Sequence, residues 1–153
     1  MDAADLAKRV MELNPVLAAV VVYGHQPSAS SQNMTVAGEI CRAIKDGAPE
    51  QKTLLVGGHV AAMPERTLRE EAADFAAGGE GLYTLLDLVE ALKAEASDFS
   101  KVRGLWYRED GRFVGNPTPP LVTDLENEMP GIAWDLLKMG EYRAHNWHCF
   151  GDL

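Results

Sequence analysis

KTLLVGGHVAAMPE, at residues 52–65, is the stretch that decides the fold of this 153-residue chain. Its apolar run LLV is typical of a strand buried on both faces. Two glycines, Gly57 and Gly58, interrupt the run, and a short loop through His59 is expected to follow. Pro64 then marks the start of a helix. A buried strand followed by a crossover helix predicts a parallel α/β sheet, a fold that binds ligands at the carboxyl ends of its strands.

The flanking sequence repeats this alternation of helices and strands. We expect helices over 2–13, from Ser28 or Ser30 as the cap to about 45, over 64–71 and over 82–93, and strands over 16–23, 54–56 and 73–77. The run VLAAVVVY at 16–23 is as apolar as the central strand, so it too is predicted to be buried on both faces. Three parallel strands make a small sheet for a doubly wound fold, which usually has five or six.

The remainder of the chain has a different character. Asp110-Gly111 lies between the strand-like runs 105–108 and 112–114, a strong hairpin signal. A proline-rich, extended segment follows, and then an irregular arm with one helical turn near 134–137. The predicted organisation is therefore an α/β domain over 1–100, a hairpin and proline-rich extension over 101–122, and an arm over 123–153.

The overall composition is that of a globular protein, with 46% hydrophobic and 24% charged residues. The 23 acidic residues outnumber the 14 basic ones, and the resulting net charge of −9 argues against binding to nucleic acid or to anionic lipid. No apolar run approaches the roughly 20 residues of a membrane span, and the start of the sequence has no signal-peptide pattern. Cys41 and Cys149 suggest no disulfide framework. We therefore expect a cytoplasmic protein that contacts neither nucleic acid nor membrane.

The candidate binding site is formed by the loops that follow the three predicted parallel strands. Because the carboxyl ends of parallel strands meet at one edge of a sheet, these loops should lie together there. They combine bare glycine backbone with a few polar groups, as ligand pockets do: Tyr23, Gly24, His25, Gln26, Ser28, Gly57, Gly58, His59, Gly79, Glu80 and Gly81. The alternative is that these segments are ordinary turns with exposed histidines.

Other chemistries have weaker support in the sequence. The GGEG segment at 78–81 lacks the lysine of a phosphate-binding loop, and Glu80 would repel phosphate, although its carboxylate suits a helix N-terminus. His145, His148 and Cys149 have no second ligand cluster, so no metal site is predicted. The serines at 28, 30 and 31 have no nucleophile-elbow motif around them. No catalytic residue is predicted.

Five segments, in this order, resemble the cobalamin-binding domain of cobalamin-dependent radical SAM proteins. They are VYGHQPS at 22–28, LLVGGHVAAMPE at 54–65, DFAAGGEGLYTLLDL at 74–88, GLWYREDGRFVGNP at 104–117 and PLVTDLENEMP at 120–130. The resemblance covers about residues 5–143. The family includes methyltransferases and the anaerobic magnesium-protoporphyrin ester cyclase.

The resemblance implies a flavodoxin-like (Rossmann-type) sheet that lacks its first strands, with a corrinoid over the carboxyl edge. Gly57 and Gly58 match the glycine pair that lines the nucleotide tail of the cofactor. The 23–28 loop matches the loop beneath the corrin, and residues 79–81 match the third wall of the site. The D-x-H-x-x-G motif that supplies a cobalt ligand elsewhere is absent, so neither His25 nor His59 is assigned to cobalt.

The resemblance also implies a larger enzyme. The C-x-x-x-C-x-x-C motif that holds a [4Fe-4S] cluster is absent, so S-adenosylmethionine and the cluster would belong to a radical SAM barrel C-terminal to Leu153. We expect a cobalamin-binding module, not catalytic alone, whose parent enzyme carries out methyl transfer or related radical chemistry. The alternatives are a cofactor-free interaction module of the same fold and a flavin or nucleotide binder at the same edge. An exposed sheet edge further predicts self-association.

Overall fold

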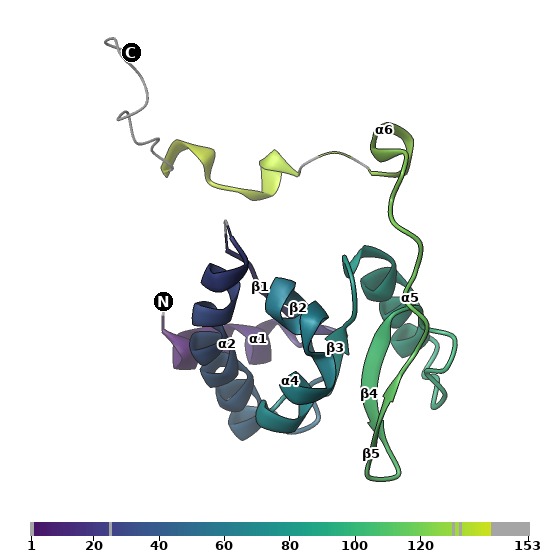
Figure 1. Ribbon diagram of the computed structural model, residues 1–153. Coiled ribbons are helices and arrows are strands. Elements are labelled where there is room, and N and C mark those ends of the chain that lie inside the picture. Colours follow the sequence, from purple (N-terminus) through teal and green to yellow (C-terminus); the bar gives the residue numbers. More distant parts are fainter. Residues whose placement is uncertain (1, 25, 130, 132, 142–153) are drawn as a thin grey trace. The chain divides into compact units, whose positions relative to one another are not determined.

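The computed structural model describes residues 2–24, 26–129, 131 and 133–141 (Figure 1), and divides into two units at Pro120 and Leu121. The first unit contains α1 (Ala3–Leu13), β1 (Ala18–Val22), α2 (Pro27–Gly47), β2 (Thr53–Gly57), α3 (Gly58–Ala62), α4 (Pro64–Glu70), β3 (Phe75–Ala77), α5 (Leu82–Lys93), β4 (Leu105–Glu109) and β5 (Arg112–Gly115). The second contains α6 (Leu125–Glu128) and the 3-10 turns η1 (Trp134–Leu136) and η2 (Met139–Glu141). None of the helices in the described part is long and apolar enough to span a bilayer.

The five strands form one mixed sheet in the order β1-β2-β3-β4-β5. The first three pair in parallel, as predicted from the alternation of helices and strands. The hairpin is also confirmed, because Asp110 and Gly111 both have positive φ, the geometry of a type I′ turn. Its strand β4 pairs antiparallel with β3, so the hairpin enlarges the three-stranded sheet. The α/β, flavodoxin-like class predicted from the sequence is thus confirmed.

The sheet carries an apolar cluster on each face. On one face, side chains of α2, α3 and α4 pack against the strands, the buried members being Val22, Met34, Ala37, Cys41, Leu55, Val60, Leu68, Ala73 and Ala76. On the other face, α5 supplies Leu88 to a cluster with Leu54, Phe75, Ala77, Val102, Leu105 and Tyr107. Consecutive residues of β2 enter opposite clusters, which confirms that this strand is buried on both faces.

The same prediction was wrong for β1. Its alternate residues Ala18 and Val22 are buried, but Val21 is 66% exposed on the other face. The reason lies in the order of the strands. Since β1 is the edge strand and α5 packs over β2, β3 and β4, the second face of β1 receives no cover from that helix.

Two predictions about loops and caps were also wrong. The expected loop through His59 is the helix α3, because Gly57 turns the chain straight from β2 into helical backbone. The N-cap of α2 is Gln26, with Pro27 in the first turn, instead of Ser28 or Ser30. Ser30 lies inside the helix and is buried, where it serves the site described below.

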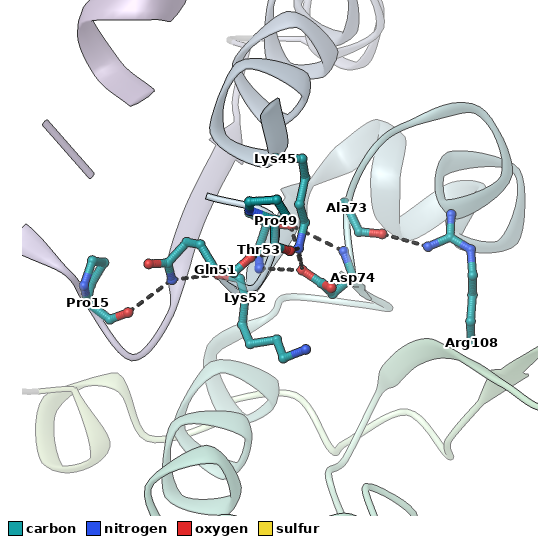
Figure 2. Close-up of polar contacts among 9 residues, drawn as sticks. All are labelled: Pro15, Lys45, Pro49, Gln51, Lys52, Thr53, Ala73, Asp74 and Arg108. Carbon is teal, nitrogen blue, oxygen red and sulfur yellow. Dashed lines mark hydrogen bonds and ion pairs between the residues drawn. The ribbon is translucent and has the colours of Figure 1, made fainter. Parts of the chain in front are cut away.

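A polar network joins α2, β2 and β3 at the amino edge of the sheet (Figure 2). One carboxylate oxygen of Asp74, Oδ2, accepts hydrogen bonds from the Thr53 backbone N–H at 2.8 Å and from the Thr53 hydroxyl at 2.9 Å. The same oxygen lies 2.7 Å from Lys45 Nζ, and the two side chains are only 23% and 21% exposed. Three donors therefore converge on one half-buried oxygen, which makes Asp74 the centre of the network.

Neighbouring side chains complete this edge by binding backbone carbonyls. Lys45 also donates to the carbonyls of Pro49 and Gln51, which ties the end of α2 to the turn before β2. The Gln51 amide donates to the Pro15 carbonyl, and Arg108 of β4 donates to Ala73 (Figure 2). These hydrogen bonds hold the amino ends of the parallel strands in register.

We expect the Asp74→Ala substitution to lower the free energy of unfolding by about 3 kcal/mol, because it leaves Thr53 and Lys45 without their shared acceptor in a half-buried place. Urea unfolding followed by circular dichroism measures the change. The matched control is Glu70→Ala, which breaks an exposed helical ion pair with Arg66 and should cost less than about 0.5 kcal/mol. Equal losses for the two variants would contradict the assignment.

Cys41 should make the stability of the fold depend on alkaline pH. Burial among the apolar side chains of α2, α3 and α4, together with the nearby carboxylate of Glu71, raises the pKa of its thiol from 9.0 to about 11. The fold therefore favours the neutral thiol, and this contribution is present below pH 9 and is lost as the pH rises through 11. Between pH 8 and pH 11, wild type should lose about 2 kcal/mol more than Cys41→Ala, in which other titrating groups are unchanged. Parallel pH profiles of the two proteins in urea would contradict this.

Candidate functional site

The three predicted strand-end loops lie at one edge of the sheet. Val22 pairs with Gly57 and Leu55 pairs with Ala76, so β1, β2 and β3 end side by side. Each is followed by a helix, respectively α2, α3 and α5 (Figure 1). The structure thus brings together Tyr23, Gly24, Gln26, Ser28, Gly57, Gly58, His59, Gly79, Glu80 and Gly81, while His25 lies outside the described residues.

The neighbouring glycines Gly57 and Gly58 have different structural roles. Gly57 has a φ of +149°, and a Cβ there would lie 2.1 Å from the Val22 carbonyl oxygen. Only glycine therefore fits between β1 and β2 at this point. Gly58 is exposed, and the nearest atoms to a Cβ on it would be those of the Ser30 side chain, at 3.8 Å and beyond. Gly57 is required by the fold, whereas a side chain on exposed Gly58 would begin with no more than an ordinary contact to Ser30.

Two serines of α2 connect β1 to α3. The buried hydroxyl of Ser30 donates to the Val22 carbonyl at 2.8 Å and accepts from the His59 backbone N–H at 3.1 Å. Ser31 Oγ lies 2.8 Å from His59 Nδ1, so this contact sets the orientation of the imidazole. His59 is half-buried, and its second ring nitrogen takes no part in the contact with Ser31.

The first loop is held at its base and exposed at its tip. Asn33 Nδ2 donates to the Tyr23 carbonyl at 2.7 Å, which fixes the exit of β1. The side chain of Tyr23 itself is 75% exposed. The backbone carbonyl of Gln26 accepts a hydrogen bond from the Ala29 N–H at the start of α2, and Gln26, like Ser28, is exposed. The loop therefore presents an aromatic ring, an amide and a hydroxyl to solvent on a fixed backbone.

The third loop is shaped by its glycines. Gly81, at φ +81°, is the N-cap of α5, and a Cβ on it would press on the side chain of Val56. Gly78 is buried and donates its N–H to the Gly104 carbonyl at 2.8 Å. Gly79 and Glu80 are exposed between these two fixed points. Glu80 lies just before the N-cap, at the amino end of α5, where the helix dipole favours a carboxylate.

Sequence reasoning missed several residues that build this edge. Asn33 was not considered, Ser30 was considered only as a helix cap or a nucleophile, and Ser31 only as a nucleophile. Each of these three side chains extends from α2 and forms a hydrogen bond with a segment outside that helix. Polar side chains spaced along the first turns of a helix that follows a buried strand could have indicated this role. Thr118, whose methyl group would be 3.1 Å from a Cβ on Gly79, had no such signal because it comes from the distant proline-rich segment.

The charge of the edge restricts its chemistry. None of the described residues at the three junctions carries a fixed positive charge, and Glu80 adds a negative one. A polyphosphate would find no counter-charge among these residues. Exposed glycine backbone, a tyrosine ring and neutral hydrogen-bonding groups suit a large ligand of low charge density.

The first unit also has a surface hollow at the opposite edge of the sheet. This hollow, of about 550 Å³, lies at the amino ends of β1 and β2, lined by Met11, Asn14, Pro15, Val16, Gly47, Ala48, Pro49, Glu50, Gln51 and Lys52. It is a broad surface depression, and the glycine in its lining, Gly47, ends α2 and does not precede a helix. Within the described part of the chain, no three histidine, cysteine or carboxylate side chains are grouped to hold a metal ion; His145, His148 and Cys149 lie outside the described residues.

We expect opposite outcomes for alanine at the two neighbouring glycines. Gly57→Ala should lower the free energy of unfolding by more than about 3 kcal/mol, since the new Cβ meets the Val22 carbonyl at a φ that alanine avoids. Gly58→Ala should change it by less than about 1 kcal/mol, because its Cβ makes only an ordinary contact with Ser30 at a helical position. Thermal and urea unfolding of both proteins measure the difference. A comparable loss at Gly58 would show that the space before it is occupied by packing.

Comparison with known proteins shows a match in fold. No family model and no curated protein sequence matches the chain. Among solved structures, it is similar to the radical S-adenosylmethionine methyltransferase TsrM from Kitasatospora setae with cobalamin and a [4Fe-4S] cluster bound, with a TM-score of 0.61 and 19% identity over 78% of this chain and 21% of that one. It is also similar to the cobalamin-dependent S-adenosylmethionine radical enzyme OxsB with aqua-cobalamin bound, with a TM-score of 0.59 and 21% identity over 78% of this chain and 16% of that one.

The chain therefore spans about a fifth or less of the enzymes that it resembles. At these identities the likeness concerns the fold. The resemblance inferred from the five sequence segments is confirmed at that level: this chain has the fold of one part of two radical SAM enzymes whose structures contain cobalamin.

Proposed function

We propose that this chain is a cobalamin-binding module and that the corrinoid lies over the carboxyl edge of β1, β2 and β3. The observation that carries the proposal is the exposed backbone of Gly58, where a Cβ would make only ordinary contact with Ser30, between two further glycine-bearing loops. A flat macrocycle with a long nucleotide tail needs exposed backbone along which it can lie, and glycines without Cβ atoms provide it. The fold shared with TsrM and OxsB, whose structures contain cobalamin, supports the same ligand.

The residues present fit such a cofactor. Gly57 and Gly58 would line its tail, with His59 beside them held by Ser31. The fixed loop from Tyr23 to Ser28 would lie under the macrocycle, and residues 79–81 would form the third wall. The single phosphodiester of the tail needs no cluster of cations, which is consistent with the absence of fixed positive charge at the described junctions.

The role of the chain is to bind and orient the cofactor. Bound cobalamin supplies a cobalt centre that can carry a methyl group. The protein's own part is positional: Ser30 and Asn33 fix the loop backbones, and Ser31 fixes the imidazole of His59. None of these side chains is proposed to react, so the module alone should bind without turnover.

The parent enzyme that we propose is a radical SAM protein whose barrel follows Leu153 and carries the [4Fe-4S] cluster and S-adenosylmethionine. Methyl transfer is its proposed chemistry, with cyclisation as the other reaction that the family resemblance allows. The second unit supports a further domain as partner, because its large apolar side chains are exposed: Leu121, Leu125, Trp134, Leu136, Leu137 and Met139. We propose that this arm leads towards the barrel.

Binding of hydroxocobalamin to Gly58 variants tests the proposal. The full chain, mixed with hydroxocobalamin and desalted, should retain the corrin absorption. Gly58→Leu should weaken binding by about tenfold or more, because its side chain enters the space assigned to the tail. The matched control is Gly140→Leu, which makes the same substitution at an exposed glycine of the second unit, where nothing lies within 4 Å of the new Cβ.

Melting temperatures of the three proteins identify any loss that is due to misfolding. If wild type retains no corrin, the proposal is wrong. Retention of flavin mononucleotide instead would favour a flavin or nucleotide binder, and retention of neither would favour a cofactor-free interaction module. Equal binding by wild type and Gly58→Leu would place the corrinoid elsewhere on the chain.

A further inference from the structure

The outer edge of β1 carries unpaired backbone groups. The Ala18 N–H donates towards β2, to the Lys52 carbonyl at 2.9 Å, so Ala18, Val20 and Val22 direct their backbone groups to β2. Ala19 and Val21 therefore direct theirs to the outer edge, where no strand of the described chain pairs with them. Two N–H donors and two carbonyl acceptors alternate along this edge.

The edge is bordered by an apolar hollow. The hollow, of about 270 Å³, is formed by β1 and the adjoining side of α2, and its lining is Val20, Val21, Val22, Tyr23, Asn33, Val36, Ala37 and Ile40. Val36, on the α2 side, is 55% exposed. A strand added to β1 would thus find both backbone partners and a helix already extending over it.

The opposite edge of the sheet is built differently. There, β5 begins with Arg112 and ends at Gly115, and Asn116-Pro117 follows at once. Charged residues and prolines are the usual protection of an edge strand against pairing with another chain. The sequence of β1, AAVVV, has neither.

We propose that a second copy of this chain pairs with the outer edge of β1, with the two β1 strands antiparallel across a twofold axis. With Val20 at the axis, Ala19 of one copy faces Val21 of the other, and each of these two pairs can exchange two hydrogen bonds. The edge is therefore self-complementary in donors and acceptors. The Asn33 amide already satisfies the Tyr23 carbonyl, which limits pairing to this central segment.

The lining of the hollow does not oppose a second copy, although the chain is acidic. Although the net charge is −9, no side chain that lines the hollow is charged, so a twofold contact there sets no like charges against each other. Val36 and Ile40 of each α2 would meet apolar groups of the other copy. The contact lies on the side of β1 away from β2 and does not depend on cobalamin.

Sedimentation velocity of the full chain between about 1 μM and about 500 μM, without corrinoid, tests this pairing. Wild type should change reversibly from monomer to dimer across this range. Ala19→Pro removes an outward N–H at an edge position that tolerates proline, and Val36→Asp puts two carboxylates at the contact. Each should raise the dissociation constant by about tenfold or more. The control Leu86→Asp changes a similarly exposed residue of α5, 61% exposed, outside the hollow, and should dimerise as wild type does.

Amide hydrogen exchange provides a readout that needs no variant. The N–H groups of Ala19 and Val21 should exchange more slowly in the concentrated sample, while the exposed amides of β5 keep one rate. A wild type that stays monomeric throughout the range overturns the proposal. So does a dimer in which the Ala19 and Val21 amides exchange as fast as in the monomer, or one that Leu86→Asp weakens as much as folded Val36→Asp does.

Discussion

The close approach of β1 and β2 at Gly57 is the constraint on which the rest of the structure depends. The Val22 carbonyl occupies the space where any side chain at residue 57 would begin. Because the two strands end together in this way, α3 starts directly after β2 and the Ser30 hydroxyl can bind both β1 and α3. The exposed backbone of Gly58, on which the proposed binding site is centred, is a consequence of this junction.

The amino edge performs the complementary task. The Asp74 carboxylate binds donors from β2 and α2, and Arg108 of β4 donates to the Ala73 carbonyl just before β3. Side-chain hydrogen bonds therefore fix the parallel strands at both ends, and the close backbone approach at Gly57 adds to them at the carboxyl end. Rigid strands with bare loops at their carboxyl ends are a suitable base for a large cofactor, since the loops need not reorganise to receive it.

The binding edge and the proposed dimer edge meet at β1. Asn33 belongs to both, because it fixes the backbone of Tyr23 and lines the hollow beside the strand. The two surfaces are nevertheless distinct: the cofactor site uses the ends of the strands, whereas the dimer contact uses the side of one strand. This separation is what allows the corrinoid and dimerisation experiments to fail independently.

Local pattern in the sequence was enough to determine the parallel strands, the hairpin and the helices α1 and α5, because each is marked by its own periodicity, proline or glycine. It also indicated that glycine-bearing loops would meet at one edge, since parallel strands end together. It did not determine that β1 is half exposed, because the run VLAAVVVY reads the same in a central strand and in an edge strand. Nor did it determine the contacts of Ser30, Ser31 and Asn33, whose partners lie on other elements. Burial and hydrogen bonding between distant segments depend on the order of strands in the sheet, and only the tertiary structure fixes that order.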